Sequence, residues 1–210
     1  MKVLLVNGSP RKSGCTYTAL TEVANTLNEE GIDTEIFYIG TKPIAGCLGC
    51  GKCGELNKCI QNDKVNECLD KLASADGFIF GSPVYYASAN GSLISFMDRL
   101  FYAGSRRGKE SFYLKPAAAV TSARRAGTTS TIDEINKYFS IAQMPIVSSQ
   151  YWNMVHGNTP DEVKQDLEGM QIMRTLGRNM AFMLKCKEAA LKAGVEMPKT
   201  EDPMRTNFIR

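Results

Sequence analysis

Residues 2–16 have the sequence KVLLVNGSPRKSGCT, from which the type of fold can be predicted. It begins with a largely apolar run, which is typical of a strand buried on both faces of a sheet. A loop of glycine and polar residues follows, and apolar residues then recur at helical spacing between Thr16 and Glu30. A buried strand that passes through a tight loop into a helix predicts the start of a parallel β–α–β arrangement.

The same alternation continues along the chain. Five strands and five helices in turn predict an α/β domain with a parallel sheet that is covered on both faces. We expect one domain over residues 1–195, with a cysteine-rich loop at 40–63 and a tail at 196–210, and Gly169 and Gly177 are expected to interrupt the last helix. The expected strands are Lys2–Asn7, Thr34–Ile39, Gly77–Phe80, Pro116–Thr121 and Pro145–Ser148, and the expected helices are Thr16–Glu30, Val65–Ser74, Ala89–Tyr102, Thr129–Ile141 and Asp161–Ala193.

Composition narrows the class of protein. The chain has 210 residues, of which 43% are hydrophobic, and 25 basic against 22 acidic residues leave a net charge of +3. This balance does not favour a nucleic-acid or membrane-surface partner. Since the apolar runs are far shorter than the roughly 20 residues that span a bilayer, and no signal peptide is apparent, we expect a cytoplasmic protein.

The loop after the first strand has the features of an anion site. Ser9, Ser13 and Thr16 carry hydroxyl groups and Arg11 a guanidinium, and the next helix begins at about Thr16. Helix N-termini bind phosphate through free backbone N–H groups and the helix dipole. The spacing fits neither GxxxxGK[ST] nor GxGxxG, which disfavours a P-loop and an ordinary dinucleotide site. The alternative is a plain turn with a threonine N-cap.

Two segments together carry a family resemblance. GSPRKSGCT (residues 8–16) and GSPVYYASANGSLISFMDRL (residues 81–100) resemble the flavodoxin-like NADPH-dependent FMN reductase family. The resemblance implies a flavodoxin-like three-layer sandwich with a five-stranded parallel sheet in the order 2-1-3-4-5. It also implies that Ser9, Arg11, Ser13 and Thr16 hold the FMN phosphate. Cys15 occupies a place where such proteins often carry asparagine.

The loop after the third strand is where the resemblance places the flavin ring. A flat ring system needs a stacking surface and backbone donors, and a proline-initiated loop with two tyrosines offers both. The tyrosines have an alternative interpretation as half-buried core residues, and Asn90 as a helix cap rather than a flavin contact. The candidate residues are Pro83, Val84, Tyr85, Tyr86, Ala87 and Asn90.

The loop after the fourth strand is polar and doubly basic. The resemblance implies that this region flanks the pyrimidine edge and ribityl chain of the flavin. A guanidinium there would stabilise the negative charge of reduced flavin. Either arginine can instead bind the 2′-phosphate of NADPH or lie in solvent. The candidates are Ser122, Arg124, Arg125 and Gly127.

Four of the seven cysteines lie close together in the sequence. Cys47, Cys50, Cys53 and Cys59 form a C-x2-C-x2-C-x5-C pattern among glycines. Four thiolates on such a loop can hold a [4Fe–4S] cluster, and the pattern resembles that of iron–sulfur flavoproteins, a subgroup of the same fold. Zinc bound to four cysteines and a loop of free thiols are the alternatives.

These features together predict an FMN-dependent oxidoreductase. Electrons would pass from NAD(P)H or a ferredoxin-like donor through FMN, with or without a [4Fe–4S] cluster, to a small acceptor. Because the chemistry is centred on the flavin, no side chain is assigned as a catalytic acid or base. The resemblance implies a homodimer or homotetramer. The alternatives are a non-enzymatic redox sensor that binds flavin or metal, and an electron carrier that uses the cysteine loop.

Overall fold

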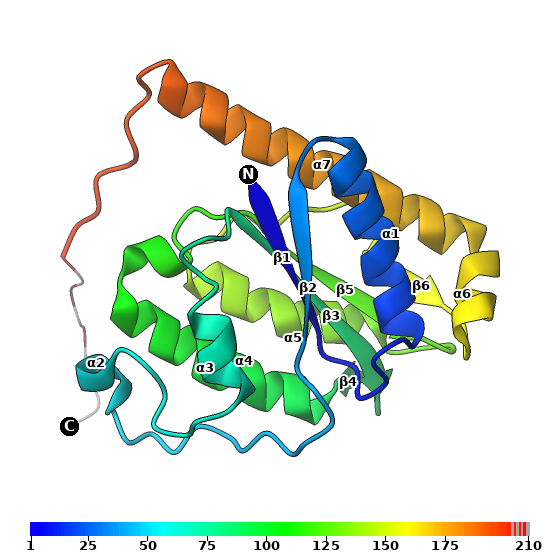
Figure 1. The fold of residues 1–210 in the computed structure, drawn as a ribbon, viewed down its shortest axis with the longest axis horizontal. Helices are drawn as coiled ribbons and strands as arrows, with labels where there is room; N and C mark the ends of the chain where they lie inside the picture. The colour runs from blue at the N-terminus through cyan, green and yellow to red at the C-terminus, as the bar shows by residue number, and fades with distance from the viewer. Residues whose placement is uncertain (203, 205, 207, 209–210) are drawn as a thin grey trace.

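A sheet with strand order β2-β1-β3-β5-β6 forms the centre of the computed structural model, which describes residues 1–202, 204, 206 and 208 (Figure 1). These five strands are parallel, and the short β4 pairs antiparallel with the end of β3. All the parallel strands therefore present their carboxyl ends at one edge. The strands are β1 (Lys2–Asn7), β2 (Asp33–Tyr38), β3 (Gly77–Tyr85), β4 (Ser88–Ala89), β5 (Ala117–Ala123) and β6 (Met154–His156).

Helices cover both faces of the sheet (Figure 1). On one side lie α1 (Cys15–Glu29), α6 (Pro160–Gln165) and α7 (Leu167–Lys192), and on the other α3 (Lys64–Leu69), α4 (Gly91–Arg107) and α5 (Thr128–Ile141). The short α2 (Cys53–Leu56) lies in the cysteine loop, and a 3₁₀ turn covers Lys109–Ser111.

The apolar run of β1 explains the three layers. Val3 and Leu5 pack in the core beneath α1 and α7, while Leu4 and Val6 pack in the core beneath α3, α4 and α5. All four are fully buried, because successive side chains of a strand point to opposite faces and both faces are covered. The predicted flavodoxin-like class is confirmed, and the five parallel strands follow the order 2-1-3-4-5 when they alone are counted along the chain.

The fifth strand lies later in the chain than the sequence predicted. Around Pro145–Ser148 the structure has only an isolated bridge between Ala117 and Ile146, and regular pairing with β5 begins at Met154. Between the two, the chain leaves the sheet edge in a loop. The side chain of Asn153 closes this loop by donating to the Val147 carbonyl (3.3 Å) and accepting from the Ser149 hydroxyl (2.8 Å).

The last helical segment is interrupted at Asp166, not at the two glycines. The Asp166 carboxylate accepts from the backbone N–H of Gly169 (2.9 Å) and of His156 (2.6 Å), so it caps α7 and ties it to β6. Gly177 lies inside α7, where a Cβ would stand 2.8 Å from Cβ of Thr26. This glycine therefore permits the close approach of α7 and α1.

Other boundaries differ by a few residues. β3 continues to Tyr85 instead of ending at Phe80, and α4 extends to Arg107. Residues 196–202 form neither helix nor strand, and the expected tail also includes residues 203, 205, 207, 209 and 210, which lie outside the described part. None of the helices in the described part of the chain combines the length and the apolar character that crossing a bilayer requires.

Candidate functional site

The loop after β1 is shaped by a buried asparagine at the end of the strand. The Asn7 carboxamide accepts from the Ser9 N–H (3.1 Å) and donates to the Lys12 carbonyl (3.1 Å). The Ser9 hydroxyl in turn accepts from the Arg11 N–H (3.1 Å). Asn7 is fully buried and holds both ends of the turn, yet its place in an apolar run gave no sign of this role.

The start of α1 leaves backbone donors free. Gly14 is the N-cap residue and supplies no side-chain cap, and the first turn contains no acidic residue. The N–H groups of the first turn therefore point toward the loop with the positive end of the helix dipole. The buried Thr16 hydroxyl lies 2.8 Å from that of Ser122, which joins this helix to the end of β5.

Cys15 faces the loop after β6. Its sulfur lies 3.7 Å from the Gly157 carbonyl oxygen. Burial raises the pKa of the Cys15 thiol, against the lowering effect of a backbone hydrogen bond and of Arg11. The thiol is therefore protonated at neutral pH and acts as a weak donor rather than as a nucleophile.

The end of β3 turns back through a tight hairpin. Tyr86 and Ala87 have φ angles of +51° and +59°, a left-handed backbone conformation that residues other than glycine seldom adopt. Helix α5 holds the hairpin: Glu134 accepts from the Ser88 hydroxyl (2.6 Å) and the Ala89 N–H (2.8 Å). Tyr86 is consequently fully exposed and Tyr85 half-exposed beside the β1 loop.

Asn90 joins two of the loops. Its side chain caps α4 by accepting from the Ser92 N–H (3.2 Å) and donates to the Gly8 carbonyl (2.6 Å). Its own N–H donates to the Ser82 hydroxyl (2.9 Å). Both groups of the buried carboxamide therefore bind backbone atoms, and Asn90 holds the β1 loop against the start of α4.

The two arginines in the loop after β5 differ in their position relative to the cavity described next. Arg124 lines the cavity described next, whereas Arg125 does not; the Arg125 carbonyl lies 3.1 Å from Nε2 of His156. Gly127 is the N-cap residue of α5 with φ +93°, and a Cβ there would stand 2.6 Å from Cα of Ala87. This glycine lets the loop pack directly on the hairpin.

These loops surround an open cavity of about 200 Å³ at the carboxyl edge of the sheet. Nine of the fifteen predicted cofactor residues line it, namely Ser9, Arg11, Cys15, Thr16, Pro83, Val84, Tyr85, Ser122 and Arg124. The other six, Ser13, Tyr86, Ala87, Asn90, Arg125 and Gly127, do not. Ala123, Gly157 and Asn158 complete the lining and were not predicted.

The four clustered cysteines surround a second, smaller hollow of about 20 Å³. Cys47 and Cys50 are exposed, Cys53 is buried and Cys59 is partly buried. Among the described residues no three cysteine, histidine or acidic side chains converge as ligands of a single metal ion. The donor set of four thiols around one hollow fits an iron–sulfur cluster by its chemistry, and four thiolates are a donor set for zinc as well.

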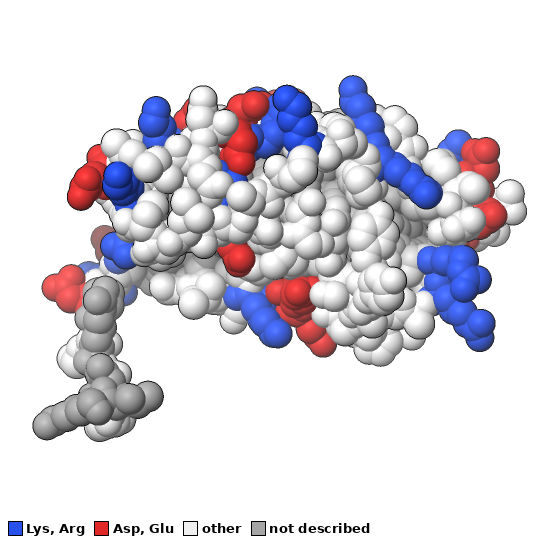
Figure 2. Space-filling model, turned by 90° about the horizontal axis from the view of Figure 1, so that it is seen from below, with Lys and Arg blue, Asp and Glu red and all other residues white. Residues whose placement is uncertain are grey.

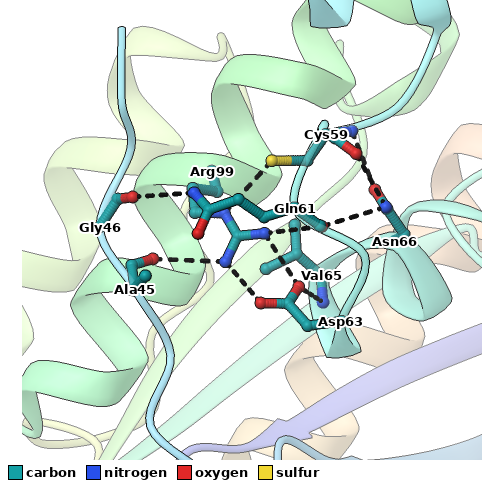
Figure 3. Close-up of polar contacts among 8 residues, drawn as sticks. All are labelled: Ala45, Gly46, Cys59, Gln61, Asp63, Val65, Asn66 and Arg99. Atoms are coloured by element: carbon teal, nitrogen blue, oxygen red, sulfur yellow. Dashed lines mark hydrogen bonds and ion pairs between the residues drawn. The ribbon is translucent and has the colours of Figure 1, made fainter. Parts of the chain in front are cut away.

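Arg99 of α4 makes contacts with several residues of this loop (Figure 3). Its side chain is 1% exposed, and its Nε donates to Sγ of Cys59 (3.3 Å). The two terminal nitrogens donate to the Asp63 carboxylate at 2.6 and 2.9 Å, and to the carbonyls of Ala45 (3.3 Å) and Gln61 (3.0 Å). Burial lowers the pKa of Arg99, but the hydrogen bonds to Asp63 and Cys59 outweigh it and raise the pKa overall.

Further contacts fix the ends of the cysteine loop. The Asn66 side chain accepts from the Cys59 N–H (2.9 Å) and donates to its carbonyl (2.9 Å), and the Gln61 side chain donates to the Gly46 carbonyl (3.1 Å) (Figure 3). Figure 2, which shows the protein from below the view of Figure 1, has basic and acidic side chains intermixed, most of them toward the rim of the view. The positive charge in contact with Sγ of Cys59 is that of the buried Arg99.

Comparison with known proteins gives consistent results. Residues 1–159 match the model of the NADPH-dependent FMN reductase family. An iron–sulfur flavoprotein of Methanocaldococcus jannaschii is 36% identical over 194 residues, which cover 88% of this chain and 98% of that protein.

Solved structures share the fold. The structure of RosB with a bound 8-demethyl-8-formylriboflavin-5′-phosphate intermediate has a TM-score of 0.71 at 16% identity, and the match covers 99% of this chain and 92% of that one. A flavodoxin from the Archaea has a TM-score of 0.59 at 16% identity, with 88% and 99% covered.

Proposed function

The chain belongs to the NADPH-dependent FMN reductase family, and from this premise we propose that it is an FMN-dependent oxidoreductase that takes electrons from NAD(P)H or a ferredoxin-like donor and delivers them to a small acceptor. FMN, when bound, supplies the chemistry, because it accepts electrons in pairs and can release them singly. The side chains of this chain bind, orient and shield the flavin.

The observation that carries the proposal is the uncapped start of α1 beside Arg11. Free backbone N–H groups, the hydroxyls of Ser9 and Thr16 and the guanidinium of Arg11 face the same cavity. This donor set fits a phosphate, which accepts hydrogen bonds on three oxygens and carries negative charge. We assign the FMN phosphate to this end of the cavity, with Ser13 at its exposed rim.

The flavin ring is assigned to the hairpin side. The cavity is smaller than the roughly 300–1,000 Å³ of typical ligand pockets, so part of FMN would lie outside it. The half-exposed Tyr85 and the exposed Tyr86 offer a stacking surface there. Arg124 would stand near the electron-rich edge of the reduced ring.

We assign a [4Fe–4S] cluster to Cys47, Cys50, Cys53 and Cys59. The shared hollow and the arginine beside one sulfur support this, since four thiolates give the cluster a net negative charge. These four cysteines would hold the cluster, which would supply one-electron chemistry beside that of FMN. The exposed aromatic pair Tyr151 and Trp152 supports contact with a second copy of the chain in a homodimer or homotetramer.

Replacement of Arg11 tests the phosphate assignment. Loss of a charged hydrogen bond costs roughly 1.5–3 kcal/mol, so Arg11→Met should weaken FMN binding by about ten- to a hundredfold. Lys12→Met is the matched control, because Lys12 is also exposed and basic but does not line the cavity. Titration of flavin fluorescence measures the FMN affinity of both variants. Equal affinities in the two variants, or no FMN binding by the unaltered chain, would contradict the assignment.

A spectrum tests the oxidoreductase and the cluster together. Protein purified without oxygen should show flavin bands on a broad absorption that dithionite bleaches, with about four iron atoms per chain. Turnover of NAD(P)H with ferricyanide that depends on added FMN would support an enzyme. Stoichiometric reduction without turnover would instead favour a redox sensor.

A further inference from the structure

Arg99 carries a contact that the fold does not require. A buried charge can be neutralised by one carboxylate, and Asp63 already meets the guanidinium with both oxygens. The Nε–H nevertheless points at Sγ of Cys59, 3.3 Å away. The planar guanidinium can bind the Asp63 carboxylate and the Cys59 sulfur at the same time. A lysine ammonium does not have donors fixed in this geometry.

All five N–H donors of Arg99 are used. One reaches the cysteine sulfur, two reach Asp63, and two reach the carbonyls of Ala45 and Gln61. These acceptors lie before the first clustered cysteine, at the fourth one and just after it. The side chain therefore fixes both ends of the cysteine loop from the middle of α4.

The same helix turns further side chains toward the loop. Tyr102 and Ala103 line the hollow with Arg99, three and four residues further along the helix. Arg106 lies on the same side, but it is exposed and contacts the Tyr102 hydroxyl (3.1 Å) rather than a sulfur. Arg99 is thus the guanidinium in direct contact with a clustered cysteine in the described part of the chain.

We propose that Arg99 is a positioning residue of the cysteine site, which holds the Cys59 sulfur for the cluster and favours the reduced cluster through its Nε–H. This inference rests on the [4Fe–4S] assignment made above. A hydrogen bond to a ligating sulfur favours the cluster state with more negative charge, and such bonds are among the factors that set cluster potentials. Removal of the donor should therefore lower the reduction potential.

The test compares two substitutions that keep the positive charge. Arg99→Lys removes the Nε–H donor, and Arg106→Lys is the control on the same helix. Redox titration followed by electron paramagnetic resonance should show the equilibrium constant for cluster reduction fall about tenfold in Arg99→Lys, which corresponds to about 59 mV for one electron. Arg106→Lys should keep the potential of the unaltered protein.

A second measurement leaves Arg99 in place, in case Arg99→Lys does not fold. Protein labelled with ¹⁵N in the arginine guanidinium groups should show a nitrogen hyperfine coupling to the reduced cluster, and the coupling should persist in Arg106→Lys. A loaded cluster with no such coupling and an unchanged potential in Arg99→Lys overturns the role of Arg99 alone. Failure of the unaltered chain to take up iron overturns the cluster assignment as well.

Discussion

Asn90 shows at the scale of one residue how a side chain can hold a site together without entering it. Its carboxamide donates to the Gly8 carbonyl and accepts from the Ser92 N–H, and it is 8% exposed. The residue thus connects the β1 loop to the start of α4. Removing it leaves a helix without its cap and a buried carbonyl without its donor.

Asn90→Ala should therefore destabilise the protein by about 2 kcal/mol, the combined cost of a lost N-cap and a lost buried hydrogen bond. Urea unfolding followed by circular dichroism measures this. Asn179→Ala is the control, since Asn179 is exposed and makes one hydrogen bond, to the Ser148 carbonyl. Similar unfolding midpoints for both variants would show that Asn90 has no special role in holding the two loops.

The sequence predicted which residues surround the cavity better than it predicted how they are held. Ser9, Arg11 and Thr16 could be recognised because hydroxyls and a guanidinium before a helix are suited to an anion. Asn7 could not, because it ends an apolar run and its partners lie in the loop that it shapes. Gly157 and Asn158 reach the cavity through the pairing of β6 with β5, which depends on the tertiary fold.

Helix α5 packs directly against the β3–β4 hairpin that carries Tyr85 and Tyr86. Gly127 lies at φ +93° with the hairpin against it, and a Cβ would stand 2.8 Å from Cγ1 of Val84 and 2.6 Å from Cα of Ala87. A side chain there would separate the helix from the turn. The left-handed φ adds a further cost for any residue with a Cβ.

Gly127→Ala should lower the free energy of unfolding by at least about 2 kcal/mol, because strain and steric overlap add. Gly91→Ala provides the comparison: it is the first residue of the neighbouring helix α4, and a Cβ there would meet no atom within 4 Å. Chemical denaturation should leave Gly91→Ala at or above the stability of the unaltered protein. A Gly127→Ala variant as stable as Gly91→Ala would contradict the close packing of α5 on the hairpin.

The long elements were predictable because their apolar spacing is clear, as in β1 and α1. The fifth strand was placed too early, because Pro145–Ser148 has strand-like residues but lies at a sheet edge, where only one neighbour fixes the pairing. The interruption of the last helix was assigned to glycines, whereas a capping carboxylate at Asp166 causes it. The position of the fifth strand depends on its pairing with β5, and Asp166 is held by the backbone N–H of His156 in β6. The local sequence does not reveal either contact.

At the scale of the whole molecule, the cysteines differ in what folding does to them. Cys47, Cys50 and Cys186 are exposed, while Cys68, a residue of α3, is fully buried in the core on that side of the sheet. Burial strongly raises the pKa of the Cys68 thiol from its ordinary value of 9.0, while the smaller effect of Lys71 lowers it and that of Glu35 raises it. The folded protein therefore keeps a proton that the unfolded chain releases near pH 9.

This difference makes the stability of the protein depend on pH. Above about pH 9 the native state binds more protons than the unfolded state, so the free energy of unfolding falls as pH rises, by up to about 1.4 kcal/mol per pH unit from this one thiol. Below the ordinary thiol pKa both states are protonated and the effect is absent. Urea unfolding between pH 7 and pH 10 measures this slope, and Tyr138 adds an effect of the same sign only toward pH 10, because burial raises its pKa above the ordinary value of 10.0.

Cys68→Ala should be less stable at pH 7, because it leaves a small space in the core, but its stability should fall less steeply between pH 9 and pH 10. The remaining slope would come from other groups whose pKa values change on folding. Burial raises the pKa of Cys15, which acts in the same direction as Cys68, and lowers the pKa of Lys115, which acts in the opposite direction. Cys186→Ala is the control for loss of a cysteine outside the core, because Cys186 is exposed. If Cys68→Ala and the unaltered protein lose stability in parallel above pH 9, the buried thiol is not the group that links stability to pH.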